Sequence, residues 1–138
     1  MYLEISKPMD YRVGLYIRLS KEDDREGQSE SVANQLSMLT EFASQQRLDV
    51  YDTYIDDGWS GTNFDRPAFQ RLIADIEAKK VNMVITKDLS RLGREYIETG
   101  RYMRRVFPAY GVRFIAINDN VDTENDAADD LTVSVKNI

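Results

Sequence analysis

Serine hydroxyls and arginine guanidinium groups occur together at three places in the sequence, each time after a short apolar run. The residues are Arg18 and Ser20, then Ser60 and Arg66, then Ser90, Arg91 and Arg94. A guanidinium group stays charged at any relevant pH and matches two phosphate oxygens at once. A serine hydroxyl can attack phosphorus when neighbouring cations stabilise the developing charge. These residue types favour a serine nucleophile that attacks a phosphodiester, the alternative for the arginines being ordinary solvated surface positions.

The first apolar run must position Arg18 and Ser20. Side chains alternate along a strand, so Tyr16, Arg18 and Ser20 share one face with Gly14. The opposite face is entirely apolar and consists of Val13, Leu15, Ile17 and Leu19. The run alone is compatible with a central strand or with an edge strand that has one wet face. The two similar motifs downstream favour the central position.

Apolar runs alternate with amphipathic segments along the rest of the chain. The further predicted strands are Val50 to Ile55, Val81 to Thr86 and Val112 to Ile117. The predicted connecting loops are Lys21 to Glu30, Asp56 to Phe64 and Lys87 to Gly93. This alternation predicts an α/β fold with a mainly parallel central sheet flanked by helices. Because sites in such sheets lie beyond the carboxyl ends of the strands, we expect one site built from three loops.

Three helices are predicted between these strands. Ser31 caps the first, whose apolar positions are Val32, Leu36, Leu39 and Ala43. Asp65 caps the second, which has Pro67 in its first turn and a core-facing stripe of Phe69, Leu72, Ile73 and Ile76. The third runs from about Arg94 to Phe107 and is stopped by Pro108. Leu131 to Ile138 resembles the first turns of a further helix.

The composition excludes several kinds of chemistry. The chain of 138 residues has the size of one domain, and no apolar run approaches the about 20 residues that cross a bilayer. There is no cysteine, hence no disulfide framework, which fits a cytoplasmic protein. There is also no histidine, so a Ser-His-Asp triad and a zinc site built on His or Cys are impossible. We expect no metal and no cofactor.

The net charge of −6 does not decide between nucleic acid and a small substrate. Six acidic residues lie in one stretch without Lys or Arg: Asp119, Asp122, Glu124, Asp126, Asp129 and Asp130. The other 18 acidic residues are balanced by 18 basic ones. A locally basic segment follows the third strand and contains Lys87, Arg91, Arg94, Arg101, Arg104 and Arg105.

Four motifs, taken together, resemble the catalytic domain of the serine recombinases, the family of resolvases, invertases and large integrases. They are Tyr16-Ile-Arg-Leu-Ser20, Ser31-Val-Ala-Asn-Gln35, Asp57-Gly-Trp-Ser60-Gly-Thr-Asn-Phe-Asp-Arg66-Pro67 and Ser90-Arg91-Leu-Gly-Arg94. The resemblance spans Val13 to about Ile117. The motif Lys-Asp-Leu-Ser-Arg is most similar to that of the large recombinases of transposons.

The resemblance implies a role for each matching residue. Ser20 would be the nucleophile that forms a transient 5′-phosphoserine link to DNA. The arginines of the phosphate site would be Arg18, Arg91 and Arg94, with Arg66 as a further member of the cluster. The supporting residues would be Tyr16, Gln35, Asp57, Ser60 and Ser90, where a scaffold role is equally open for the first three. Many small family members have aspartate at the position of Ser90, and here the nearest acid is Asp88.

The resemblance also implies a domain organisation and partners. Residues 1–11 would be a loose leader and residues 12–138 the catalytic domain, ending before a long assembly helix and DNA-binding domains. The partner would be DNA, bound through regions beyond Ile138, and the protein would be a homodimer that assembles into a tetramer. It would be cytoplasmic and nucleoid-associated during the reaction, without a membrane partner. Two alternatives remain at this point: a flavodoxin-like or nucleotide-binding module without DNA cleavage, and a catalytically idle assembly domain.

Overall fold

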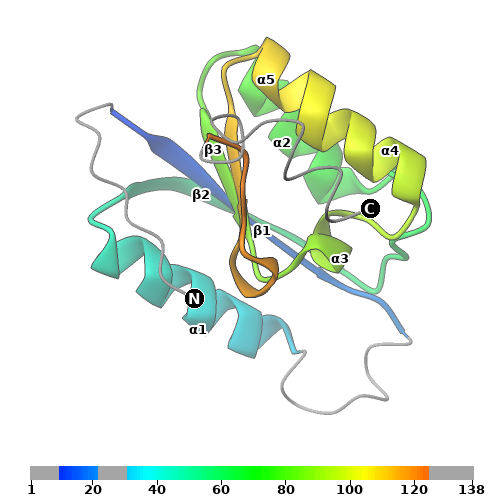
Figure 1. The fold of residues 1–138 in the computed structure, drawn as a ribbon. Coiled ribbons are helices and arrows are strands. Elements are labelled where there is room, and N and C mark those ends of the chain that lie inside the picture. The colour runs from blue at the N-terminus through cyan, green and yellow to red at the C-terminus, as the bar shows by residue number, and fades with distance from the viewer. Residues whose placement is uncertain (1–9, 22–30, 125–138) are drawn as a thin grey trace.

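A five-stranded sheet forms the middle of the fold (Figure 1). The computed structural model describes residues 10–21 and 31–124. The strands are β1 (Arg12–Leu19), β2 (Asp49–Asp57), β3 (Met83–Thr86), β4 (Arg113–Ala116) and β5 (Val121–Asp122). Their order is β2-β1-β3-β4-β5, with every neighbouring pair parallel except the β4–β5 pair. β1 therefore lies between two strands, and the predicted central position is confirmed.

Helices cover both faces of the sheet, as Figure 1 shows. One face carries α1 (Val32–Gln45), and the other carries α2 (Pro67–Glu77), α4 (Tyr96–Arg101) and α5 (Phe107–Ala109). A short α3 (Leu89–Leu92) follows β3, and a 3-10 turn, η4 (Ile117–Asp119), joins β4 to β5. The predicted α/β fold with a mainly parallel sheet is confirmed.

The two faces of β1 are buried in two separate hydrophobic clusters. Leu15 and Ile17 pack with Leu39 of α1, whereas Tyr16 packs with Phe69 of α2. Gly14 allows α2 to approach closely, since a Cβ atom there would lie 3.0 Å from Leu72 Cδ1. The alternation predicted for this strand is confirmed.

The two long helices begin in different ways. Ser31 caps α1 as predicted, its Oγ accepting a hydrogen bond of 3.1 Å from Asn34 N. The predicted cap of α2 by Asp65 is wrong: Arg66 occupies the N-cap position and makes no side-chain capping bond. The carboxylate of Asp56, at the end of β2, accepts the N–H groups of Ala68 and Phe69 at 2.8 and 3.0 Å instead. A buried acceptor from a neighbouring strand thus satisfies the N–H groups that a helix leaves unpaired at its start.

The helix predicted from about Arg94 to Phe107 is present as a continuous helical run from Tyr96 to Ala109, whereas its predicted end at Pro108 is wrong. The described chain has α3 inside the predicted 87–93 loop, then α4 from Tyr96. Pro108 does not stop the helix but lies within α5. A π-helical stretch, η3 (Tyr102–Val106), precedes it, and Phe107 N–H bonds to Tyr102 O. The shifted register lets the chain continue helically through a residue that has no N–H group.

The predicted leader is not loose at its end, because Tyr11 is buried and its hydroxyl accepts a hydrogen bond of 3.0 Å from Arg113 Nη1. Arg113 also makes a bidentate pair with Asp122. Burial opposes the charge on Arg113, but its bonds to Asp122 and Tyr11 more than offset this and raise its pKa.

The predictions for residues 1–9, for most of the 21–30 loop and for the helix at Leu131 lie outside the described residues. Within the described ranges no helix is long and apolar enough to cross a membrane.

Candidate active site

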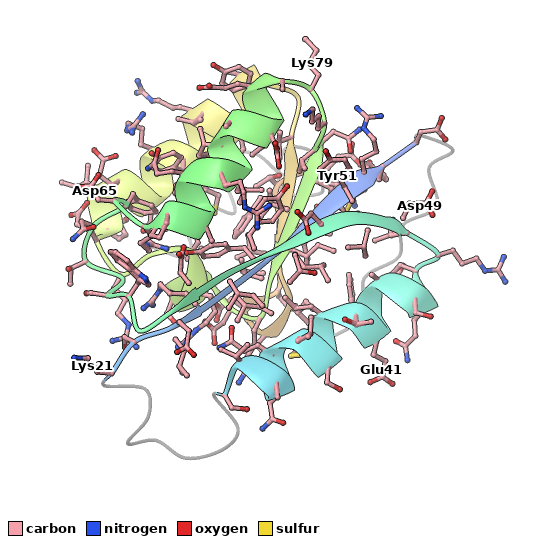
Figure 2. The ribbon with its side chains drawn as sticks, turned by 180° about the vertical axis from the view of Figure 1, so that it is seen from behind. Lys21, Glu41, Asp49, Tyr51, Asp65 and Lys79 are labelled. Atoms are coloured by element: carbon pink, nitrogen blue, oxygen red, sulfur yellow. The ribbon has the colours of Figure 1, made fainter. Side chains whose placement is uncertain are left out.

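The end of β1 and the loops after β2 and β3 meet at the carboxyl edge of the parallel strands. Ser20 directly follows β1, and the loop after β2 closes onto it through Leu19 O, which accepts Gly58 N at 2.5 Å and Trp59 N at 3.2 Å. Figure 2 shows Lys21 and Asp65 at this end of the molecule, and Asp49 and Tyr51 at the opposite end. These two backbone hydrogen bonds place the end of β1 next to the loop that follows β2.

Arg18 is fully buried and joins the second and third loops. Its Nη1 donates to Trp59 O at 3.1 Å, its Nε donates to Arg91 O at 3.2 Å, and its Nη2 donates to Ser90 O. The carbonyls of Ser90 and Arg91 belong to the last residues of α3, where a helix has no acceptor bonds of its own. Arg18 thus stabilises both the end of α3 and the loop after β2.

Arg66 is the second fully buried guanidinium at this helix end. It donates from Nη2 to Leu92 O at 2.7 Å and from Nε to Asn63 O at 2.8 Å. Its charge lies 4.5 Å from the ring centroid of Phe64, a favourable cation–π distance. In this conformation Arg66 binds protein carbonyls rather than facing solvent.

Tyr16 links Arg66 to an acid. Its hydroxyl accepts from Arg66 Nη1 at 2.8 Å and donates to Asp56 Oδ2 at 2.7 Å. Burial, opposed in part by the charge of Arg66, raises the pKa of the Tyr16 phenol, and the nearby Asp56 raises it further. Tyr16 is thus held protonated, and a chain of bonds runs from Arg66 to the carboxylate that caps α2.

Arg91 lies at the centre of the third loop and is 2% exposed. Its Nη1 donates to Arg18 O at 2.8 Å, two residues before Ser20. Its Nε donates to Asp88 Oδ1 at 3.3 Å and its Nη2 donates to Ser90 Oγ at 3.2 Å. The guanidinium is therefore oriented by the strand that carries Ser20 and by the start of α3.

Arg94 differs from the other three arginines because it is exposed. Its backbone N donates to Gly61 O at 2.7 Å. Gly61 is packed so closely that a Cβ atom would lie 2.6 Å from Arg18 Nη2 and 3.1 Å from Arg94 Cγ. This position must lack a side chain for the second and third loops to approach each other as they do.

The supporting residues divide into those that touch the arginine cluster and those that do not. Gln35, buried on α1, donates from Nε2 to Arg18 O at 3.1 Å. Ser90 Oγ contacts Arg91. Ser60 is exposed and pairs within its own loop with Thr62, at 2.9 Å between the hydroxyl oxygens. Asp57 is exposed at the end of β2, beside Leu19 in the strand register.

Ser20 and three of the four arginines, Arg18, Arg66 and Arg91, are buried in this structure. Ser20 is 2% exposed, and Arg18 and Arg66 are completely buried. Within residues 10–21 and 31–124, no three carboxylates come together in a way that could hold a metal ion. This edge of the sheet therefore combines the Ser20 hydroxyl with a guanidinium group, that of Arg91, bonded to the backbone two residues before it.

Sequence reasoning missed three residues of this site. Asp56 was assigned to a loop, although its place two residues after buried Tyr54 signals the inner face of β2. The role of Asp88 as a partner of Arg91 was passed over in favour of the position of Ser90. Nothing in the local sequence distinguishes Gly61 from other loop glycines, because its constraint comes from Arg18.

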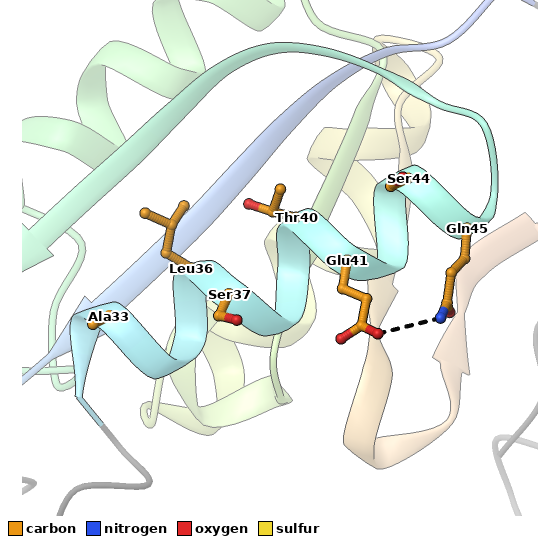
Figure 3. Close-up of a pocket in the computed structure, with 7 residues that line it drawn as sticks. All are labelled: Ala33, Leu36, Ser37, Thr40, Glu41, Ser44 and Gln45. Atoms are coloured by element: carbon orange, nitrogen blue, oxygen red, sulfur yellow. Dashed lines mark hydrogen bonds between the residues drawn. The ribbon is translucent and has the colours of Figure 1, made fainter.

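A shallow depression elsewhere on the surface is not part of this site. It lies along α1 and is lined by Ala33, Leu36, Ser37, Thr40, Glu41, Ser44 and Gln45 (Figure 3). Glu41 and Gln45 bond to each other across it at 3.4 Å. All its lining residues come from one helix, and none is a predicted site residue.

Comparison with known proteins identifies the family of this chain. A family model described as "Resolvase, N terminal domain" matches residues 13–138. The chain belongs to this family. The N-terminal catalytic domain of TP901-1 integrase is 36% identical, with a TM-score of 0.74 and a coverage of 82% of each chain.

Two further solved structures are similar to this family member. A resolvase family site-specific recombinase from Streptococcus pneumoniae is 30% identical, with a TM-score of 0.73, over 91% of this chain and 82% of that one. The C-terminal catalytic domain of ISC1926 TnpA, an IS607-like serine recombinase, is 27% identical, with a TM-score of 0.64, over 76% of this chain and 69% of that one. The predicted membership of the serine recombinases is confirmed, and the chain is a site-specific recombinase. These matches give no support to a flavodoxin-like phosphate-binding module.

Proposed function

We propose that Ser20 cleaves and rejoins DNA through a covalent phosphoserine intermediate. Ser20 Oγ loses its proton and forms a bond to phosphorus, while the bond from phosphorus to the 3′ oxygen breaks and that oxygen takes up a proton. The reverse reaction, with the 3′ hydroxyl of another strand as the attacking group, rejoins the DNA and releases Ser20. No cofactor is needed, because the phosphodiester bond energy is kept in the ester.

The pairing of Arg91 with the strand that carries Ser20 is the observation that supports this proposal most directly. Arg91 Nη1 lies 2.8 Å from Arg18 O, so a guanidinium is held next to the backbone that leads into the nucleophile. Preorganised cations close to a reacting phosphate stabilise the transition state without rearranging during the reaction. We infer that Arg91 and Arg94 contact the scissile phosphate, whereas Arg18 and Arg66 contribute through the positions of the loops. The contacts of Arg18 and Arg66 with phosphate that the family resemblance implies remain predictions.

The supporting roles follow from the same contacts. Gln35 and Tyr16 hold Arg18 and Arg66 in place through the bonds given above. Asp57 and Ser60 are exposed on the second loop and would face the DNA. Each of these roles is part of the proposal.

The test is the capture of a covalent adduct. The full-length protein is incubated with nicked duplexes that are tiled across the DNA flanking its coding sequence. We expect a protein–DNA adduct that maps to Ser20 by peptide mass spectrometry, and no adduct with Ser20→Ala at an unchanged circular dichroism spectrum. Adduct formation by Ser20→Ala near the wild-type level, or an adduct on Ser60 or Ser90, would show that another group is the nucleophile.

We also propose the partners that the family resemblance implies. DNA site recognition would be made by regions beyond Ile138, with residues 12–138 acting as the catalytic domain. The protein would work in the cytoplasm as a homodimer that assembles into a tetramer on DNA, associated with the nucleoid during the reaction.

A further inference from the structure

Asp88 has more contacts with the third loop than a simple helix cap requires. As the N-cap residue of α3 it accepts Arg91 N at 3.2 Å through Oδ1. The same oxygen accepts Arg91 Nε at 3.3 Å and Ser90 Oγ at 2.7 Å. Asp88 O in turn accepts Thr86 Oγ1 at 2.9 Å, which fixes the backbone at the end of β3. One carboxylate oxygen therefore binds the main chain and the side chain of Arg91 together.

We propose that Asp88 is a positioning residue for DNA cleavage, whose carboxylate holds the Arg91 guanidinium against the strand end that carries Ser20. This inference rests on the proposed function of Ser20. It goes beyond that function because Asp88 does not touch the substrate itself. Asp88 instead controls the position of Arg91, which does.

The two ends of the Arg91 side chain show how this positioning works. Asp88 holds the Nε end, and Arg18 O holds Nη1 at 2.8 Å. Ser90 Oγ, itself oriented by its bond to Asp88, holds Nη2 at 3.2 Å. An arginine side chain has many rotamers, and restricting them before the substrate arrives lowers the cost of ordering it in the transition state.

The charge of Asp88 contributes as well as its geometry. The guanidinium groups of Arg18, Arg66 and Arg91 are all buried and all contact the end of α3 or its neighbours, so they repel one another. The side chain of Arg91 is 3% exposed and that of Asp88 is 22% exposed. The ion pair between them offsets part of this repulsion at Arg91, the arginine whose side chain bonds to the backbone of the nucleophile strand.

Asparagine separates the positioning role from capping. Asn is as good an N-cap residue as Asp, so Asp88→Asn keeps an acceptor for the helix but removes the charge that orients Arg91. Asp119→Asn is the matched control, because Asp119 Oδ2 accepts Leu89 N at 2.6 Å at the same end of α3. It removes an equal charge from the same helix start without touching Arg91.

The experiment measures single-turnover cleavage and DNA binding of the full-length protein on the nicked duplex that gives the Ser20 adduct. We expect Asp88→Asn to slow cleavage about tenfold, because a charge-assisted hydrogen bond to Arg91 becomes a neutral one. DNA affinity should remain close to wild type, whereas the melting temperature should fall, because the repulsion among the buried guanidinium groups is no longer offset. Adding Ser90→Asp to this variant should restore most of the rate, since it places a carboxylate where Ser90 Oγ already meets Nη2. Asp119→Asn should cleave like wild type.

The possible results divide clearly. Wild-type cleavage by Asp88→Asn overturns the positioning role, and so does equal slowing by Asp119→Asn. Slowing that Ser90→Asp does not relieve shows that Asp88 acts only as a cap or a scaffold residue, which also overturns it. If the wild-type protein itself forms no Ser20 adduct, the proposed function fails first, and the inference falls with it.

Discussion

Arg18 and Arg91 each donate a hydrogen bond to the other's backbone carbonyl. Arg18 Nε lies 3.2 Å from Arg91 O, and Arg91 Nη1 lies 2.8 Å from Arg18 O. One bond fixes the end of α3 and the other fixes the last residues of β1. Two buried cations are thus held next to each other by the backbone of the loops that they connect. A change at either arginine is expected to move the segment that carries the other.

Removal of Arg94 or Arg91 should affect cleavage much more than DNA binding. Each arginine that stabilises developing charge typically contributes about 10²- to 10³-fold to the rate. The alanine variants are therefore expected to slow adduct formation by about this factor. Lysine should restore little activity at either position, because a single ammonium group cannot replace a planar fork of donors.

The two variants should differ in stability. Arg91→Ala removes charged hydrogen bonds in the interior and should lower the free energy of unfolding by about 1.5–3 kcal/mol. Arg94 is exposed, so Arg94→Ala should melt like wild type. Arg104→Ala, in η3, is the exposed control and should leave cleavage unchanged. Equal losses of binding and cleavage would identify Arg91 and Arg94 as ordinary phosphate contacts.

Gly61→Ala should disturb the site without disturbing the core. The added Cβ would lie 2.6 Å from Arg18 Nη2, so the guanidinium must leave its carbonyl partners. We expect slower cleavage and only a modest loss of stability. Gly100→Ala, in α4, is the matched control, since its Cβ would meet nothing within 4 Å. Alanine there should stabilise the helix by about 0.5–1 kcal/mol and leave cleavage unaltered. Wild-type cleavage by Gly61→Ala would mean that Arg18 need not hold its observed position.

The free energy of unfolding should decrease as the pH rises above about 10, which is the ordinary pKa of a tyrosine. Burial raises the pKa of Tyr16, so the folded protein retains a proton that the unfolded chain loses. This contribution is fully present below the pKa of the unfolded chain and is lost at higher pH. Urea unfolding between pH 8 and 11 measures the slope of the free energy of unfolding against pH. Tyr16→Phe should reduce this slope. An unchanged slope in Tyr16→Phe would contradict the protonated, buried phenol.

DNA cleavage should need no divalent metal ion. The guanidinium groups around Ser20 can supply the charge stabilisation that metal ions give other phosphoryl-transfer enzymes. Adduct formation is therefore expected to proceed at its normal rate in EDTA. Loss of activity in EDTA and its return with magnesium would favour a metal-dependent nuclease instead.

The chain of residues 1–138 should show little affinity for DNA on its own. Specific binding needs side chains that reach base edges in a groove, and the sequence has no pattern typical of a recognition helix. The acidic stretch that begins at Asp119 also repels phosphates at close range. A mobility-shift titration with random-sequence DNA and with the cleaved site measures both affinities. Tight, sequence-selective binding would mean that the element that recognises the DNA sequence lies within residues 1–138.

Much of the fold follows from local patterns in the sequence. The alternation in β1 predicted which side chains share a face of the strand, because a strand has a strict period of two. Ser31 was recognisable as a cap since its acceptor serves an N–H three residues away. The grouping of Ser20, Arg18, Arg91 and Arg94 at one edge followed from the parallel sheet, whose strands all end on the same side.

The capping of α2 and the path of the chain at Pro108 were decided by tertiary structure. Asp56 reaches Ala68 N only because β2 and α2 pack together in one register, and Asp65 next to the helix is left exposed. The continuation through Pro108 depends on a local π-helical turn that propensities alone do not signal. The capping of α2 arises from competition between a nearby partner and a better one from a neighbouring strand, whereas the continuation through Pro108 arises from a change in helical register.

The sequence by itself determined the chemistry of this protein, because hydroxyl and guanidinium groups are properties of residue types. Only the tertiary structure decided where the guanidinium groups point. Sequence reasoning directed all four arginines at a phosphate, which stays a prediction, and it did not show that Arg18, Arg66 and Arg91 also bind backbone carbonyls of neighbouring segments. The physical reason is that buried carbonyls need donors as much as a phosphate does, and which of them lies within reach depends on how the loops pack.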